Sequence, residues 1–435
     1  MIDTDSEDEL PPGWEEKLSD EGKIYYVDHN HKVTQWEHPK SGHVKRIAQE
    51  LPYGWTKEIC HENGNEIFKN SRDNKTSLVD PRLAYPISDN ENIKQGSFNL
   101  NHRYDGSTTA FTVLQSRDLT GTNVIVTGGN SGIGFETARA LACFGADVVI
   151  ACRNMKSANL KVCEIRKECK AATISSMMLN LCRLISVEKF AQAYKQKYKK
   201  LHILIINAGI FWLPYDCTPD GYERTFQTNY LGHFYLIRLL RSLLFTSAPC
   251  RIVFLTSESH RFSDLNSKTI CESILSPTTP DLYHPILNFN ISKLCLTVLC
   301  YELHRRWYHY GIGCFAVHPG NLVNTNICRY NWLGTILMFL AKPFSKTAEQ
   351  GAATAVYCAT SRDLNKLGGM YFINCIPVDP LPDVVDLDLA LSLWQLSRNM
   401  VAKAATLSGC GGLGDGFDSN VNRMFKTVDE VCIEV

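Results

Sequence analysis

The sequence predicts an α/β protein, in which a doubly wound parallel sheet is preceded by two small all-β modules of three strands each. Three observations lead to this prediction. From Asn123 onward, buried-strand patterns alternate with helical patterns. A glycine turn follows the first of these strands. Nearer the N-terminus, two stretches of similar length each begin with "LP-x-GW" and end with proline, which indicates an internal repeat.

Charge and cysteine usage narrow the classes of function. Lys+Arg and Asp+Glu both number 45, which argues against nucleic acid as the main partner. The 17 cysteines form no Cys-x-x-Cys pair and no zinc-spaced cluster, so we expect no metal site and reduced thiols in a cytoplasmic or nuclear protein. The acidic N-terminus lacks the apolar core of a signal peptide, and the longest apolar run, Trp332 to Ala341, is too short to span a bilayer. We therefore expect no membrane crossing.

The first module, residues 10–41, has the pattern of a three-stranded meander. Its "EG" and "NH" turns separate short segments rich in Tyr, Val and Thr. So short a unit buries little surface, and large aromatic side chains must hold it together. The module resembles a WW domain through five residues at the expected spacing: Trp14, Tyr25, Tyr26, Trp36 and Pro39. The resemblance implies that Trp14, Tyr26 and Pro39 form the buckle that holds the sheet together.

The same resemblance implies a peptide-binding groove in this module. Tyr25 and Trp36 would line it and accept a proline-rich ligand in the polyproline II conformation. Val27, His29 and Lys32 match the subset of WW domains that binds Pro-Pro-x-Tyr sequences. The alternative is that these aromatic residues are all core. For Trp36 we favour binding, because exposed aromatic residues in small modules serve recognition.

The second module, residues 51–82, departs from the pattern. Three residues keep the buckle: Trp55, Phe68 and Pro81. Leu78 stands in place of the second tryptophan, and Ile67 replaces the tyrosine of the groove. Without those rings the proline-binding slot is lost, so we expect a degenerate WW domain that braces the first.

The rest of the chain divides by composition. Residues 83–118 are polar and show no sustained period, which predicts a linker. Residues 119–399 hold the alternating pattern of the α/β domain, and the glycine-rich residues 400–435 are predicted to be a flexible tail.

A dinucleotide site is predicted at the first strand of the large domain. The strand "NVIVT" is followed by the turn "GGNSGIG", by a segment with helical apolar spacing, and by a second buried strand, "DVVIAC". Gly128, Gly132 and Gly134 permit a tight turn and let a pyrophosphate approach the backbone at the helix N-terminus. Arg153 follows the second strand, where a guanidinium suits a 2′-phosphate, so NADP is favoured over NAD. The alternative for Arg153 is a solvated surface side chain.

Small and polar residues gather after the later strands as well. Asn207-Ala208-Gly209 follow "LHILII", Ser257 ends "RIVFLTS", and Pro319-Gly320 follow "GIGCFAVH". The segment "GGMYFIN" is the predicted seventh strand. Ligands bind at the C-terminal ends of strands in open α/β sheets.

With these motifs, residues 123–375 resemble the short-chain dehydrogenase/reductase family, close to its retinol-dehydrogenase-like branch. The resemblance implies a Rossmann-like doubly wound sheet and a set of cofactor-binding residues: Gly128, Asn130, Ser131, Gly132, Ile133, Gly134, Arg153, Asn180, Asn207, Ala208, Gly209, Lys293, Pro319 and Gly320. Asn180 departs from the family's usual aspartate but keeps one acceptor oxygen for the adenine amino group.

The resemblance also implies a catalytic set. Asn229 would hold a water, Ser257 would donate to the substrate oxygen, and Lys293 would bind the nicotinamide ribose and lower the pKa of a tyrosine four residues earlier. Phe289 occupies that position instead. A phenyl ring fills the same space but has no proton to exchange, so we expect impaired catalysis.

Two nearby side chains are weighed as substitutes for the missing tyrosine. Tyr283 lies in the loop before the helix, and His260 lies near Ser257. Residues 329–344, "RYNWLGTILMFLAKPF", are expected to form a helical lid. Its apolar content favours a lipophilic substrate, although packing on the core explains it equally well.

Two functions follow from this sequence. One is an NADP-dependent oxidoreductase of a small lipophilic alcohol or carbonyl, tethered by its WW module to Pro-Pro-x-Tyr proteins. The other is a signalling adaptor, in apoptosis or transcription by family resemblance, whose dehydrogenase domain binds cofactor without turnover because of Phe289.

Overall fold

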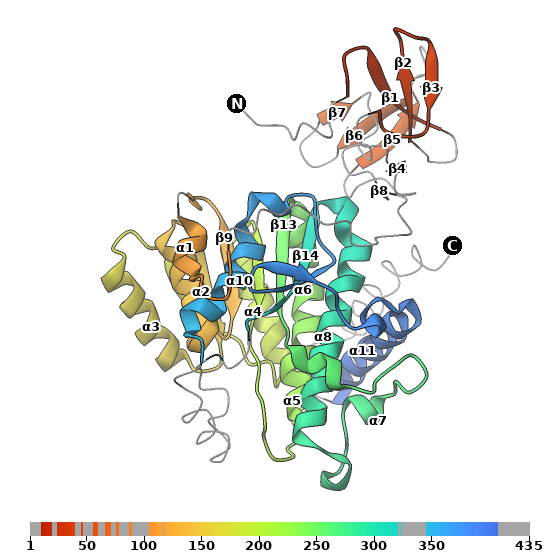
Figure 1. The fold of residues 1–435 in the computed structure, drawn as a ribbon. Coiled ribbons are helices and arrows are strands. Elements are labelled where there is room, and N and C mark those ends of the chain that lie inside the picture. Colours follow the sequence, from red (N-terminus) through yellow and green to blue (C-terminus); the bar gives the residue numbers. More distant parts are fainter. Residues whose placement is uncertain are drawn as a thin grey trace. The chain divides into compact units, whose positions relative to one another are not determined.

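The computed structural model describes residues 10–19, 24–39, 45–46, 55–59, 66–70, 75–77, 87–88, 104–115, 117–320, 323 and 345–407 (Figure 1). The expected lid, residues 329–344, lies outside this part of the chain, as do most of the predicted linker and the residues after 407. Leu78, Pro81 and the side chain of Trp55 are outside it too. The chain forms two compact units, one with the small modules and one with the α/β domain.

The first module is a three-stranded antiparallel sheet. Its strands are β1 Trp14–Leu18, β2 Ile24–Asp28 and β3 Val33–Gln35. Side chains alternate along β2, so Ile24 and Tyr26 are fully buried, and Leu10 and Trp14 pack against them. Trp36, by contrast, is 51% exposed and lies outside this core.

The second module has the same topology. Its strands are β5 Trp55–Ile59, β6 Glu66–Asn70 and β7 Lys75–Ser77. Phe68 is buried, as expected for a residue of the buckle, and Ile67 is half-buried. Between and after the modules, β4 Lys45–Arg46 pairs with β8 Ile87–Ser88.

The larger unit is built on an eight-stranded sheet in the order β11-β10-β9-β12-β13-β14-β15-β16. Its strands are β9 Asn123–Thr127, β10 Asp147–Cys152, β11 Ile174–Met178, β12 Ile203–Ile206, β13 Cys250–Leu255, β14 Ile312–His318, β15 Met370–Ile373 and β16 Ile376–Val378. Parallel pairs join β11 to β10, β10 to β9, β9 to β12, β12 to β13, and β14 to β15. The last strand, β16, pairs antiparallel with β15. The predicted fold class is confirmed.

Helices cover both faces of this sheet (Figure 1). On one face α2, α3 and α10 pack together, and on the other α4 and α6 pack together with α11 against α4. Their bounds are α2 Gly132–Cys143, α3 Met155–Glu168, α4 Leu184–Lys197, α6 Gly232–Ser247, α10 Ala348–Thr360 and α11 Leu387–Leu407. The central strands suit this arrangement, because all four residues of β12 are apolar and buried.

The helix α8, Pro285–Trp307, crosses the larger unit and carries Phe289 and Lys293. With the short turn that follows it, Pro285–Tyr310, this is the one segment among the described residues that has the length and apolar character of a membrane span. Most of its apolar window, 83%, is buried inside the protein, as in a core helix of a globular domain.

The predicted functional residues lie near the point where the order of the strands in the sheet reverses. Strand β9 lies between β10 and β12, so the connections leaving β9 and β12 lead to opposite sides. A doubly wound sheet leaves a crevice at such a point, beyond the C-terminal ends of its strands.

Candidate active site

A cavity of about 780 Å³ lies at the C-terminal ends of the central strands. Every residue predicted to bind the cofactor lines it: Gly128, Asn130, Ser131, Gly132, Ile133, Gly134, Arg153, Asn180, Asn207, Ala208, Gly209, Lys293, Pro319 and Gly320. Ser257 and Phe289 line it as well. The lining runs from Gly128 to Val323, so the crossovers of the sheet bring segments that are far apart in the sequence to one cavity.

The glycine turn, here called the cradle, is packed so closely that Gly134 has no room for a side chain. A Cβ atom on Gly134 would lie 2.2 Å from Asn207 Nδ2 and 2.6 Å from the carbonyl oxygen of Gly128. Gly128 itself has φ +67°, in the left-handed region that favours glycine. The turn leads into the N-terminus of α2, where backbone N–H groups and the helix dipole favour an anion. This geometry fits the pyrophosphate of a dinucleotide.

Thr127, which was not among the predicted site residues, fixes the other wall of the cradle. Its hydroxyl oxygen accepts hydrogen bonds from the backbone N–H groups of Asn207, at 2.9 Å, and Ala208, at 3.0 Å. The Asn207 side chain in turn donates to the carbonyl oxygen of Thr127, at 2.8 Å. A hydroxyl residue at the end of the first strand, directly before the glycine turn, was the available signal.

Arg153 follows β10 directly and is exposed in the cavity wall. Among the lining residues that the structure describes, none is Asp or Glu, whereas Arg153, Arg224 and Lys293 are cationic. Such a lining attracts phosphate groups. Asn130 lies nearby, but its side-chain amide donates to Ser157 Oγ, at 3.2 Å. Ser131, the N-cap residue of α2, makes no side-chain capping bond.

Asn180 lies at the adenine side of the predicted site. Its Oδ1 accepts a hydrogen bond from the backbone N–H of Cys182, at 3.1 Å. An amide oxygen has two lone pairs, so one acceptor position remains for a ligand amino group. Cys182 also lines the cavity, and its thiol contacts Thr228 Oγ1 at 3.1 Å.

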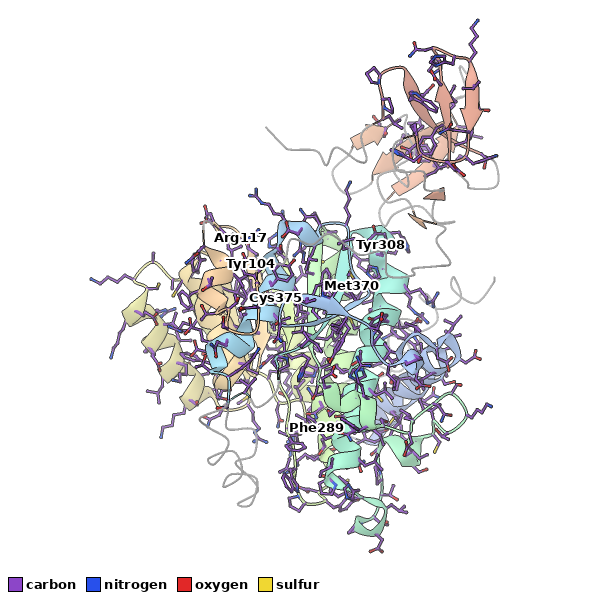
Figure 2. All side chains as sticks on the ribbon, viewed as in Figure 1. Tyr104, Arg117, Phe289, Tyr308, Met370 and Cys375 are labelled. Atoms are coloured by element: carbon purple, nitrogen blue, oxygen red, sulfur yellow. The ribbon has the colours of Figure 1, made fainter. Side chains whose placement is uncertain are left out.

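Phe289 and Lys293 lie four residues apart on α8, and both side chains are buried (Figure 2 labels Phe289). The ring of Phe289 packs edge-on against Phe211, with 4.6 Å between ring centroids. Lys293 Nζ donates to the carbonyl oxygen of Leu255, at 2.8 Å, and lies 5.6 Å from the centroid of the Phe289 ring. Burial lowers the pKa of Lys293 to about 8.

Asn229 does not line the cavity but connects the segments around it. It lies in a π-helical turn, Gln227–Leu231, just before α6. Its Oδ1 accepts from the backbone N–H of Ile210, at 2.8 Å, and its Nδ2 donates to the Ile210 carbonyl, at 3.1 Å. The same Nδ2 donates to Ser292 Oγ, at 3.0 Å. Asn229 therefore ties the loop after β12 to helix α8.

Ser257 comes from the end of β13. Its hydroxyl oxygen accepts from the backbone N–H of Ser259, at 3.2 Å, and so caps the short helical turn Glu258–Phe262. Its own hydroxyl proton remains available for an acceptor in the cavity.

Neither substitute considered for the missing tyrosine lines the cavity. The Tyr283 hydroxyl donates to the carbonyl oxygen of Leu213, at 2.9 Å. His260 is fully buried, with Nδ1 2.7 Å from the carbonyl oxygen of Ser257 and Nε2 accepting from the backbone N–H of Leu381, at 3.4 Å. A titratable residue that was not singled out, His318, does line the cavity.

The cavity has a second, apolar region. Its side chains come from the loop after β12, from the short helical turn after β13 and from the first turns of α8: Ile210, Phe211, Leu213, Phe262, Ile286 and Phe289. Such a wall suits an apolar ligand beside the dinucleotide site.

The first module has a smaller hollow of about 200 Å³, lined by Tyr25, Thr34, Gln35 and Trp36. The rings of Tyr25 and Trp36 lie 5.8 Å apart at an interplanar angle of 66°. Two aromatic rings at this spacing make a slot for a proline ring.

The other three residues of the predicted peptide site lie on the same module. Val27 is half-buried in β2, and Lys32 is exposed with φ +55°. His29 is exposed, and its Nε2 lies 2.8 Å from Glu15 Oε2.

Two family models match the chain. The model of the short chain dehydrogenase family matches residues 122–264, and the WW domain model matches residues 10–39.

Relatives share the whole arrangement or its larger domain. The WW domain-containing oxidoreductase of Homo sapiens is 49% identical over 403 residues, which are 92% of this chain and 96% of that protein. Retinol dehydrogenase 12 of Mus musculus is 40% identical over 263 residues, 59% of this chain and 79% of that protein. The crystal structure of an uncharacterized protein from Mycobacterium Paratuberculosis matches with a TM-score of 0.53 and 27% identity, over 68% of this chain and 98% of that one.

Proposed function

The chain belongs to the WW domain-containing oxidoreductases, within the short-chain dehydrogenases, and from that premise we propose a function for each unit. The larger domain binds NADP(H) and interconverts, slowly, a small lipophilic carbonyl compound and its alcohol. The first module binds Pro-Pro-x-Tyr sequences and brings the domain to its partners in cytoplasmic and nuclear signalling.

One observation carries the proposal for the larger domain. A single cavity holds the glycine cradle at the start of α2, the cation Arg153 and the pair Ser257 and Lys293. The family uses a nicotinamide dinucleotide, which supplies or receives the hydride when bound. The cradle of Gly128 and Gly134 fits its pyrophosphate, and Arg153 supports the choice of NADP through a 2′-phosphate.

The chain's own residues would divide the remaining work. The Ser257 hydroxyl donates to the carbonyl oxygen of the substrate, and Lys293 binds the nicotinamide ribose. Asn229 ties helix α8, which carries Lys293, to the loop after β12 through its hydrogen bonds with Ser292 and Ile210. The apolar wall excludes water from the reacting atoms and supports a lipophilic substrate, as does the likeness to a retinol dehydrogenase.

Phe289 limits the rate in this proposal. A positioned acid or base contributes about 10²–10⁴ to the rate of such a reaction, and the phenyl ring supplies none. Binding and orientation remain, so we expect slow turnover rather than a site without affinity.

A cofactor titration tests the proposal. Fluorescence of the full-length chain is followed as NADPH and then NADH are added. We expect NADPH to bind at least about tenfold more tightly than NADH, and Arg153→Ala to remove this preference without weakening NADH binding. Failure of the full-length chain to bind either dinucleotide would refute the proposal.

A second experiment tests the peptide groove. The full-length chain is titrated with a Pro-Pro-x-Tyr peptide, and Trp36→Ala should abolish binding because Trp36 forms one wall of the slot. Leu78→Ala in the degenerate second module is the matched control and should leave the affinity unchanged. Equal losses from both substitutions would contradict the division of labour between the modules.

The second candidate function is an adaptor whose large domain binds NADP(H) without turnover. It is favoured by the position of Phe289 in the cavity and by the hydrogen bonds that hold Tyr283 and His260 away from it. Incubation with NADPH and a panel of lipophilic carbonyl compounds separates the two functions, because only the first predicts cofactor consumption above background.

A further inference from the structure

Reduction of a carbonyl group requires a proton as well as a hydride, and the cavity must supply it without a tyrosine. The ionisable side chains that line the cavity, among the described residues, are Cys152, Arg153, Cys182, Arg224, Lys293 and His318. An arginine remains protonated at any working pH. Burial raises the pKa of Cys152, and the Cys182 thiol contacts Thr228. Lys293 and His318 remain, because an ammonium ion and an imidazole ring can each exchange a proton.

Of these two, Lys293 has the better position. It lies one helical turn after Phe289 on α8, so both side chains project on the same face of the helix. Its Nζ lies 5.6 Å from the centroid of the Phe289 ring and within 3.6 Å of the point where a Cβ on Gly209 would stand. His318 is directed to the neighbouring strand end, where Nδ1 accepts from the backbone N–H of Glu258, at 3.4 Å.

The surroundings of Lys293 favour proton release. Its Nζ donates one hydrogen bond, to the carbonyl oxygen of Leu255, and no carboxylate lines the described part of the cavity. The titratable group that faces it from α6 is His233, which is fully buried and whose pKa is lowered to about 4, mainly by burial. His233 is therefore neutral at pH 7. An ammonium ion without a counter-charge loses its proton more readily than one in water.

We propose that Lys293 is the proton donor and acceptor of this site and performs the proton transfer that a tyrosine at position 289 would have performed. In reduction, a hydride adds to the carbonyl carbon while Lys293 Nζ gives one proton to the carbonyl oxygen, directly or through one water molecule. The products are the alcohol and a neutral amine, which regains its proton from solvent. In oxidation the neutral amine accepts the hydroxyl proton. This inference rests on the proposed oxidoreductase function.

The first test reads the titration of Lys293 directly and needs no turnover. The full-length chain is labelled with 13C at lysine Cε, saturated with NADP⁺, and titrated by NMR, with Lys293→Arg used to assign the signal. We expect a midpoint near pH 8, in keeping with the buried position. A Lys293 that remains protonated beyond pH ~10, as an ordinary lysine does, would overturn the inference.

The second test is the pH profile of the slow reaction. NADPH consumption should fall about tenfold per pH unit above pH 8, because the protonated amine is the donor, and alcohol oxidation should rise as pH increases through the same midpoint. Lys293→Arg should be at least about tenfold slower and lose this dependence, since a guanidinium keeps its proton. His318→Gln is the discriminating variant: it should leave the midpoint where it is.

Three outcomes distinguish failure of this inference from failure of the proposed function on which it rests. A midpoint that disappears in His318→Gln but persists in Lys293→Arg would assign the proton to His318 and overturn the inference. No turnover in a chain that binds NADPH would overturn it too and favour the adaptor. A chain that binds no NADPH would instead refute the proposed function itself.

Discussion

Phe289 packs edge-on against Phe211 and forms part of the apolar wall of the cavity. The ring therefore preserves the shape that a tyrosine would give to this wall, and only the hydroxyl is lost. Fold and cofactor site can persist under such a substitution, because neither depends on that hydroxyl. The catalytic consequence is confined to proton transfer.

Burial of the Lys293 ammonium group lowers the stability of the folded chain, and this loss of stability can be measured. Its pKa of about 8 in the folded chain lies below the usual 10.5, so the buried ammonium destabilises the fold below pH 8, and the cost disappears as the pH rises toward 10.5. We expect Lys293→Met to raise the free energy of unfolding of the cofactor-free chain at pH 7 by about 2–3 kcal/mol.

Denaturant unfolding at pH 7 and at pH ~10 checks this prediction. The gain from Lys293→Met should shrink at the higher pH, because Lys293 is then neutral in the folded chain and begins to lose its proton in the unfolded chain. A variant that is less stable than the parent at both pH values would show that the amine is well compensated in the fold.

At the scale of single elements, the N-terminus of α2 is the part of the dinucleotide site that has the least room for an added side chain. Gly134→Ala would bring a Cβ to 2.2 Å from Asn207 Nδ2 and 2.6 Å from a backbone oxygen, so the cradle must open. We expect at least about a tenfold loss of NADPH affinity, measured by fluorescence titration.

Gly121→Ala is the control for this substitution. Gly121 has φ +81° and no neighbour within 4 Å of the added Cβ, so alanine there strains the backbone without touching the cavity. It should lower stability by about 1 kcal/mol and leave NADPH affinity intact. Equal losses of affinity in the two variants would mean that stability, and not the cradle, sets the affinity.

The elements also show where sequence reasoning succeeds and fails. Six strands, β9, β10, β12, β13, β14 and β15, are marked by apolar runs and by small or polar residues at their ends, and these predicted the position of the cavity. Strand β11 carries two serines and has no such run. Strand β16 was missed, because its hairpin turns at Asn374 and Cys375, with φ 53° and 64°, where glycine is the usual signal. The π-helical turn around Asn229 depends on tertiary hydrogen bonds with Ile210 and Ser292, which no local pattern encodes.

Within the site, sequence patterns identified groups by type but not by orientation. Tyr283 and His260 were plausible proton donors by their place in the chain, yet their hydrogen bonds to Leu213 and Ser257 hold them away from the cavity. Thr127 and His318 were not among the predicted site residues, because their contacts are with neighbours about 80 and 60 residues away, at adjoining strand ends. Those neighbours follow from the order of strands in the sheet.

At the scale of the whole molecule, the proposed peptide site and the proposed dinucleotide site belong to separate compact units. We expect them to be independent: Trp36→Ala should leave NADPH affinity unchanged, and Arg153→Ala should leave the affinity for a Pro-Pro-x-Tyr peptide unchanged. Separate titrations of each variant with both ligands check this. A change of more than about threefold in the remote affinity would reveal coupling between the units.

The proposed combination makes cofactor occupancy and partner recruitment two properties of one chain. A slow reaction is compatible with this arrangement, because recruitment by the first module does not depend on turnover in the larger domain. Family membership supports the oxidoreductase, and we propose that Phe289, which lines the cavity, limits its rate.

The most direct test of this account compares NADPH consumption by the unmodified chain and by Phe289→Tyr, at equal cofactor saturation, with the same lipophilic carbonyl compound. Restoring the hydroxyl next to Lys293 should raise the rate by about 10²–10⁴, with little change in NADPH affinity. Rapid consumption by the unmodified chain that Phe289→Tyr does not increase would contradict the account, because the phenyl ring would then impose no limit on proton transfer.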